Sequence, residues 1–183
     1  MNRVAVVGAE STGKTTLCQA LARTMGGLTF AEPLRQWVLH QGRAPTQDEQ
    51  AQVLVMQRQA EAEATARAQS TGLRWVFCDS SPLVTAAYNQ YYFNDVSLFE
   101  DALSHHQSCY TATLFCTPDG VPWTPDPGQR DGPDARERVN LLIDCWVRQL
   151  RFDHPRLVLN RHTNARLIHS LQFIRAQDLQ RFT

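Results

Sequence analysis

The feature that most constrains the fold is a short apolar run followed by a glycine-rich octapeptide. Residues 4–7 read VAVV, the β-branched and apolar composition of a buried strand. Residues 8–15 read GAESTGKT and match every fixed position of the pattern GxxxxGK followed by Ser or Thr. Residues 14–25 then place Leu17 and Leu21 on one face of a helix. A strand, a glycine-rich turn and a helix in this order predict a phosphate-binding loop, or P-loop.

Each fixed residue of this loop has a physical role in holding a triphosphate. The two glycines let backbone amides converge on phosphate oxygens without a clash from a Cβ atom. Lys14 places a compact charge on the β- and γ-phosphates, and the hydroxyl of Thr15 is a ligand for Mg²⁺. Lys14 is also the one lysine among 18 basic residues, and arginine does not replace a point charge there. The expected site for ATP and Mg²⁺ comprises Gly8, Glu10, Ser11, Thr12, Gly13, Lys14, Thr15 and Thr16.

Further apolar segments alternate with helical ones along the chain. The expected strands are residues 4–7, 28–31, 75–78, 110–116 and 157–159. The expected helices are residues 14–25, 33–40, 46–71 and about 97–107, with one more from Pro133 and a last one from about residue 163. Thr46 with Glu49, and Ser97 with Glu100, have the spacing of capping boxes. Because parallel strands need helical crossovers, the alternation predicts an α/β fold with a five-stranded parallel sheet covered on both faces.

Two carboxylates follow predicted strands, at the sheet edge where ligands of parallel sheets bind. Asp79 follows the third strand, so it is placed to hold Mg²⁺ or take the proton of an acceptor, or else to cap the next helix. Glu32 follows the second strand. It is placed to accept a proton from an attacking hydroxyl, to bind a sugar diol, or to begin a helix favoured by the helix dipole. Arg35 lies three residues on, on the same helical face.

Residues 117–133 have the composition of a loop, with five prolines and three glycines. This segment carries Arg130, and Arg136 follows in the next helix. Phosphoryl transfer builds negative charge on the transferred group, so arginines that close over it lower the barrier. We expect a lid loop in which Arg130 and Arg136 are catalytic, and the alternative is a solvated surface loop. The loop at residues 160–164 is placed either beside the nucleotide base or as an ordinary connection.

Composition narrows the class of protein. Equal numbers of acidic and basic residues, 18 each, remove a broad attraction to nucleic acid or anionic membranes. The sequence has no apolar run long enough to span a bilayer, and its start does not resemble a secretory signal. The five cysteines form no CxxC pair, and His105 and His106 are expected at the surface. We expect a single cytoplasmic domain over residues 1–183.

Four segments of the chain together resemble a known family. They read GAESTGKTTL at 8–17, AEPLRQWV at 31–38, VFCDSSPLVT at 76–85 and PWTPDPGQRDGPDARERV at 122–139. In this order and spacing they resemble the kinase domain of the NadR-like nicotinamide riboside kinases, within the AAA_28 group of P-loop proteins. The resemblance implies a three-layer P-loop kinase-type sandwich with a lid loop at about 117–133. It further implies site roles for Glu32, Arg35, Asp79, Asp126, Arg130 and Arg136.

The activity that this resemblance implies is transfer of the γ-phosphate of ATP, with Mg²⁺, to a nucleoside-type hydroxyl, foremost that of nicotinamide riboside. The family has an Asp-Thr-Asp-like triplet where this chain reads Asp-Ser-Ser at 79–81, so the second acid is missing. The Glu-Pro pair at 32–33 is also similar to the deoxynucleoside kinases, whose Glu-Arg-Ser after the third strand is not matched. A regulatory P-loop ATPase switch with a protein partner is the alternative from another class. No nucleic-acid or membrane partner is expected.

Overall fold

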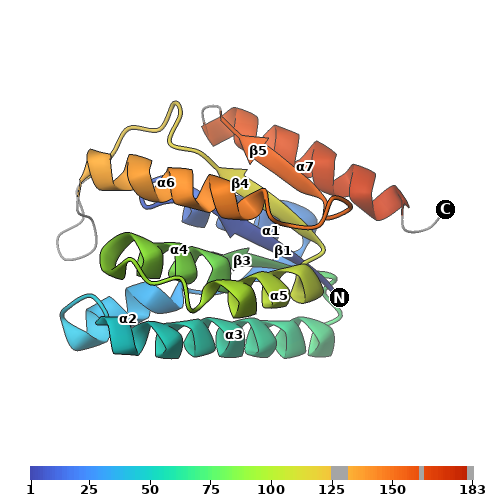
Figure 1. Ribbon diagram of the computed structural model, residues 1–183. Helices are drawn as coiled ribbons and strands as arrows, with labels where there is room; N and C mark the ends of the chain where they lie inside the picture. Colours follow the sequence, from blue (N-terminus) through green and yellow to red (C-terminus); the bar gives the residue numbers. More distant parts are fainter. Residues whose placement is uncertain (125–131, 161–162, 181–183) are drawn as a thin grey trace.

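The computed structural model describes residues 1–124, 132–160 and 163–180, and Figure 1 shows a central sheet surrounded by helices. The strands are β1 (Asn2–Val7), β2 (Gly27–Thr29), β3 (Trp75–Asp79), β4 (Ala112–Cys116) and β5 (Arg156–Leu159). The helices are α1 (Lys14–Met25), α2 (Pro33–Gln41), α3 (Gln47–Ser70), α4 (Pro82–Phe93), α5 (Phe99–Cys109), α6 (Pro133–Val147) and α7 (Thr163–Gln180). In these described ranges, no helix combines the length and apolarity needed to cross a membrane.

The sheet places β1 at its centre. The strand order is β2-β3-β1-β4-β5 and every neighbouring pair is parallel, which confirms the predicted five-stranded parallel sheet. Val4 of β1 is in register with Phe77 of β3 on one side and with Ala112 of β4 on the other. The chain therefore builds one half of the sheet, returns past β1 and builds the other half. Ligands of open α/β sheets bind at such a switch point, outside the carboxyl ends of the strands.

Alternate residues of the central strand β1 face two separate cores. Val4 and Val6 pack with side chains of α1 and α7 on one face of the sheet. Ala5 and Val7 pack on the other face with side chains of α3, α4, α5 and α6. Because both faces are covered, the central strands are apolar at every position rather than at alternate ones. The predicted three-layer arrangement is confirmed.

Helix α5 corrects one of the predicted capping boxes. The box at Thr46 and Glu49 is present and begins α3, but the one expected at Ser97 and Glu100 is wrong. Helix α5 starts later, at Phe99, because the carboxylate of Asp95 accepts the backbone N–H of Ser97 at 2.8 Å. This bond and further ones lower the pKa of Asp95. A turn closed by a side chain therefore precedes the helix and takes up the N–H that the predicted cap would have used.

Two further segments differ from the expectation. Strand β2 covers Gly27–Thr29 instead of 28–31, because a Cβ at Gly27 would lie 2.9 Å from the Cβ of Trp75, and glycine alone allows β2 to start this close to β3. Helix α4 at Pro82–Phe93 fills a segment that is missing from the expected helices and was implied only by the alternative role of Asp79 as a helix cap. Its first turns are buried on every side, so they lack the one-sided apolar pattern of a surface helix.

The expectation that His105 and His106 lie at the surface is wrong for His106, which is fully buried. Its Nε2 lies 2.8 Å from the hydroxyl of Thr113, which in turn lies 2.8 Å from Nε2 of the buried His154. Burial lowers the pKa of both imidazoles. The hydroxyl donates to one ring and accepts from the other, so it joins the Nε2 atoms of two neutral histidines inside the core, while Nδ1 of His106 has no hydrogen-bond partner among the described residues.

Candidate active site

A cavity of about 820 Å³ lies at the carboxyl ends of β1 and β2. It has the size of a site for a small molecule or a nucleotide. The P-loop lines one wall with Glu10, Ser11, Thr12, Gly13, Lys14, Thr15 and Thr16. The remaining wall consists of Glu32, Leu34, Arg35, Val38, Ala44, Pro45, Gln50, Thr85, Tyr88, Tyr92, Phe93, Val121, Pro122 and Thr124.

The P-loop turns tightly between β1 and α1. Gly8 has a φ of 150°, and a Cβ there would collide with the carbonyl oxygen of Cys116 at the end of β4. Gly8 therefore serves the turn sterically and does not line the cavity. The carbonyl of Ala9 accepts hydrogen bonds from Thr12 Oγ1 at 2.8 Å and from Lys14 Nζ at 2.9 Å. The ammonium group of Lys14 thus binds the backbone of the loop itself. A bound phosphate would replace the Ala9 carbonyl as the partner of this ammonium group.

Thr15 and Asp79 meet although 64 residues separate them. Thr15 Oγ1 donates to Asp79 Oδ2 at 2.6 Å, while Asp79 Oδ1 is buried and has no hydrogen-bond partner within the described part of the chain. A buried anionic oxygen beside a hydroxyl fits Mg²⁺, bound directly or through water. No group of three or more His, Cys, Asp or Glu side chains in the described residues is arranged to hold a metal. Mg²⁺ takes few protein ligands and completes its shell with water and substrate phosphates.

The wall opposite the P-loop comes from α2 and α4. Glu32 and Arg35 line the cavity from the start of α2, so the structure brings both predicted acceptor residues to the P-loop. Tyr88 and Tyr92 of α4 stack with ring centroids 5.9 Å apart. This wall can therefore present a carboxylate, a guanidinium and aromatic faces to a second substrate.

Tyr88 connects this wall to the P-loop. Its hydroxyl oxygen accepts a hydrogen bond from the backbone N–H of Glu10 at 3.1 Å. Burial raises the pKa of Tyr88, and the nearby carboxylates of Glu10 and Glu32 raise it further. The carboxylates of Glu10 and Glu32 thus both lie near one phenol, and the cavity has an acidic region next to the P-loop.

The segment after β4 closes over the P-loop from the other side. Trp123 Nε1 donates to the carboxylate of Glu10 at 3.3 Å, and the backbone N–H of Thr124 donates to Ser11 Oγ at 3.1 Å. Arg136 is buried and donates to the carbonyl of Val121 at 3.0 Å. The structure places Arg136 against the base of the predicted lid and outside the cavity lining, so its catalytic role stays a prediction. Asp126 and Arg130 lie outside the described residues, as do the two residues at 161–162.

Comparison with protein families identifies the family of this chain. The family model AAA_28, described as an AAA domain, matches residues 3–166. The chain belongs to the AAA_28 family. No curated protein matches this AAA_28 chain in sequence.

Several solved structures share the fold of this AAA_28 domain. A NadR protein in complex with NAD and AMP-PNP is 20% identical with a TM-score of 0.76, covering 96% of this chain and 49% of its own. A deoxyadenosine kinase from M. mycoides with bound dATP is 12% identical with a TM-score of 0.61, covering 96% and 100%. A thymidylate kinase from Ehrlichia chaffeensis is 16% identical with a TM-score of 0.69, covering 94% and 98%. The AAA_28 chain thus has a P-loop kinase fold and spans about half of the NadR chain.

Arg166 of α7 contacts the site of the AAA_28 domain, and the sequence analysis did not identify it. Arg166 is 2% exposed, and its guanidinium donates to the carbonyls of Thr12 at 2.6 Å, Thr117 at 2.7 Å and Asp119 at 3.0 Å. The sequence shows only one arginine among 17 in an unremarkable helical segment. No local pattern reveals this contact, because its partners are backbone atoms 154, 49 and 47 residues away.

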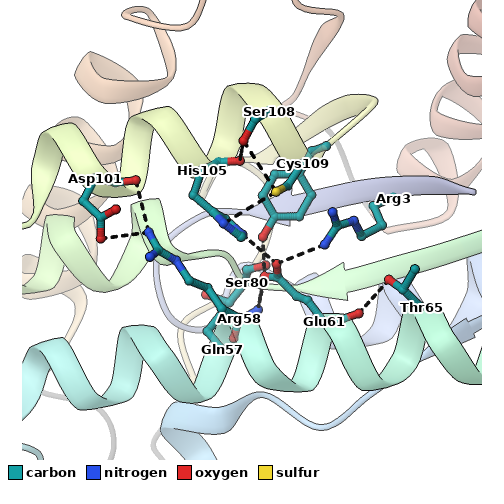
Figure 2. Close-up of polar contacts among 11 residues, drawn as sticks. Arg3, Gln57, Arg58, Glu61, Thr65, Ser80, Asp101, His105, Ser108 and Cys109 are labelled. Atoms are coloured by element: carbon teal, nitrogen blue, oxygen red, sulfur yellow. Dashed lines mark hydrogen bonds and ion pairs between the residues drawn. The ribbon is translucent and has the colours of Figure 1, made fainter.

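A buried carboxylate behind the β3 end of the AAA_28 domain was also not identified (Figure 2). Glu61 of α3 is fully buried and accepts hydrogen bonds from Gln57 at 2.9 Å, from His105 at 3.0 Å and from the hydroxyl of Tyr110. Gln57 also lies 3.4 Å from the carbonyl of Ser80, directly after Asp79. The sequence feature that could have revealed Glu61 is a single acidic residue on the buried face of a long polar helix. Its several hydrogen-bond partners explain how the burial of this carboxylate is tolerated.

Proposed function

We propose that this AAA_28 domain is an ATP- and Mg²⁺-dependent phosphotransferase that phosphorylates the hydroxyl of a nucleoside-type acceptor, foremost nicotinamide riboside. The observation that carries the proposal is that one cavity is lined on one side by the P-loop and on the other by carboxylate, guanidinium and aromatic side chains. A P-loop ATPase without a small acceptor has no use for such a wall. The fold shared with nucleoside and nucleotide kinases supports the same activity.

Binding and positioning supply most of the catalysis in phosphoryl transfer. Lys14 and the P-loop amides hold the β- and γ-phosphates in line with the acceptor. Thr15 and Asp79 hold Mg²⁺, which neutralises charge on the phosphate oxygens when it is bound. The Thr15–Asp79 hydrogen bond of 2.6 Å keeps together the two oxygens that would hold the metal.

Glu32 is the general base of the proposed reaction. It lines the cavity, whereas Asp79 lies outside the lining and already accepts a hydrogen bond from Thr15. The acceptor oxygen attacks the γ-phosphorus as its proton passes to Glu32, and the bond from the γ-phosphorus to the bridging oxygen breaks to release ADP. Arg35, one helical turn on, is placed to orient the sugar of the acceptor.

The acidic and aromatic surroundings favour an acceptor with a positively charged ring. Glu10, Glu32 and the aromatic residues Tyr88, Tyr92 and Phe93 line the same cavity. Aromatic faces attract cations by electrostatics, and more strongly where water is excluded. The pyridinium ring of nicotinamide riboside has this charge, whereas a deoxynucleoside is neutral. The second candidate, a deoxynucleoside, is favoured by the Glu32-Pro33 start of α2 and by the shared fold with deoxyadenosine kinase.

The test measures acceptor-dependent release of ADP and formation of the phosphorylated product by mass spectrometry. The acceptors are nicotinamide riboside, its uncharged reduced form, deoxyadenosine and thymidine. We expect the cationic acceptor to have a kcat/KM at least about tenfold above that of its reduced form, a ratio typical of a desolvated cation on aromatic faces. A preference for a deoxynucleoside would select the second candidate. Slow ATP hydrolysis that no acceptor changes would favour the regulatory switch.

A pair of glutamate variants tests the role of the base. Glu32→Gln is expected to lower kcat by about a hundredfold or more, the usual contribution of a general base, while the Kd for ATP changes less than about twofold. Glu63→Gln, on the exposed surface of α3, is the control and keeps full activity. Equal losses in turnover and ATP affinity for Glu32→Gln would contradict the assignment.

A further inference from the structure

We propose that Arg166 is a positioning residue of the nucleotide site, fixing the peptide between Thr12 and Gly13 so that the Gly13 N–H faces the triphosphate. The inference rests on the proposed binding of ATP by the P-loop. It adds to that site a residue of α7 that lies outside the glycine-rich motif.

The contacts of Arg166 join two segments that border the site. One terminal nitrogen donates to the Thr12 carbonyl at 2.6 Å, within the P-loop. The other donates to the carbonyls of Thr117 and Asp119 at 2.7 and 3.0 Å, directly after β4. These are short bonds from a charged donor that is 2% exposed, and such bonds are the strong ones. The planar, rigid fork of arginine spans both segments, which a lysine ammonium cannot do.

The direction of the Thr12 carbonyl sets the direction of the next amide. In a trans peptide the C=O and N–H groups point in opposite directions, and the described residues contain no cis peptide. Arg166 draws the Thr12 carbonyl toward α7, away from the cavity. The Gly13 N–H therefore points to the opposite side, where Gly13 lines the cavity. Gly13 has a φ of 82°, so without this anchor its two peptides have more freedom than those of other residues.

The surroundings of Cys116 agree with this placement. Burial raises the pKa of Cys116 to about 11, and the positive charges of Arg166 and Lys14 act against that increase. The carbonyl of the same residue packs against Gly8. Two cations thus lie close to the end of β4, one held by the P-loop carbonyl of Ala9 and one by that of Thr12. Arg166 places its charge on the side of the loop that faces α7.

The test compares Arg166→Lys and Arg166→Gln with the wild type, and uses Arg175→Gln on the exposed face of the same helix as the control. The Kd of AMP-PNP with Mg²⁺ is measured by calorimetry, where the stoichiometry reports the folded fraction separately from affinity. We expect the Kd to rise by about tenfold or more in Arg166→Lys, the effect of losing one charge-assisted hydrogen bond, and further in Arg166→Gln. The KM of the acceptor should stay within about twofold, and Arg175→Gln should match the wild type.

Two results would overturn the inference. An unchanged Kd in folded Arg166→Lys and Arg166→Gln would show that the P-loop amide needs no anchor. Parallel loss of nucleotide and acceptor affinity, or of folding in both variants, would assign Arg166 to general stability. A wild-type protein that binds AMP-PNP but phosphorylates no acceptor would refute the proposed function instead, and the affinity comparison would still decide the role of Arg166.

Discussion

The buried pair of histidines predicts a loss of stability between neutral and mildly acidic pH. Nε2 of His106 is satisfied by Thr113, but its Nδ1 is buried without a hydrogen-bond partner in the described structure. Protonation would therefore bury a charge together with an unsatisfied N–H, which explains why burial lowers the pKa of His106 below 6.5. His154 lies on the other side of the same hydroxyl, and its pKa is also lowered, by burial and then by Arg156.

The sign and the size of the effect follow from proton linkage. A histidine with a lowered pKa in the folded state contributes stability above pH 6.5, and this is lost as the pH falls because only the unfolded chain takes up the proton. Each such group lowers the free energy of unfolding by at most about 1.4 kcal/mol per pH unit. We therefore expect His106 to contribute a loss of about 1 kcal/mol between pH 6.5 and 5.5, and of up to about 1.4 kcal/mol between pH 7.5 and 5.5, with His154 adding to it.

Urea unfolding at pH 7.5, 6.5 and 5.5 measures this loss. His106→Gln should be less stable than the wild type at pH 7.5 but should lose about 1.4 kcal/mol less on acidification to pH 5.5. His40→Gln, at an exposed position of α2, should keep the pH dependence of the wild type. Glu49, whose pKa is lowered to about 2 by its bonds to Arg43 and Thr46, acts below this range and does not confuse the result. Identical pH dependence of the wild type and His106→Gln would refute the reasoning.

Two further substitutions test the P-loop. Lys14→Ala should abolish turnover while circular dichroism and the thermal midpoint show an intact fold, and retained turnover would remove Lys14 from the site. Gly8→Ala should lower the free energy of unfolding by about 3 kcal/mol or more, because its Cβ meets backbone atoms of β4. The matched control is Gly72→Ala, where φ is also positive but no atom lies within 4 Å of the added Cβ. This substitution should lower the free energy of unfolding by about 1–2 kcal/mol. Equal losses for the two variants in urea unfolding would contradict the steric argument.

Local chemistry made much of the fold predictable from the sequence. The apolar run at residues 4–7 lies within β1, and Pro133 begins α6 as expected. The capping box of Thr46 and Glu49 is a contact between near neighbours, so its residues specify it. Helix α4 was not predictable in the same way, because its first turns are buried on all sides and therefore have no one-sided apolar stripe. The Ser97 cap failed because Asp95, two residues earlier, competes for the same N–H.

In the candidate site, too, some residues could be predicted from the local sequence and others could not. Residues at strand ends converge because parallel strands end at one edge, so the meeting of Glu32 and Arg35 with the P-loop at one cavity could be expected. The bond between Thr15 and Asp79 has the same origin. Arg166, Glu61 and His106 depend on how helices pack on the assembled sheet, which no short pattern encodes. Arg136 shows that residue type alone does not predict the role of an arginine. In the sequence, a buried arginine that donates to the Val121 carbonyl cannot be distinguished from one that contacts a phosphate.

The two helices that form the acceptor wall differ in how freely they can change. Helix α4 presents one side to the cavity and the other to the main core, so a substitution there that admits a new ligand also disturbs folding. Helix α2 buries only Pro33 and Trp37. Divergence of ligand preference among proteins with this architecture should therefore accumulate on α2, and directed evolution toward a new acceptor should begin with Leu34 and Val38.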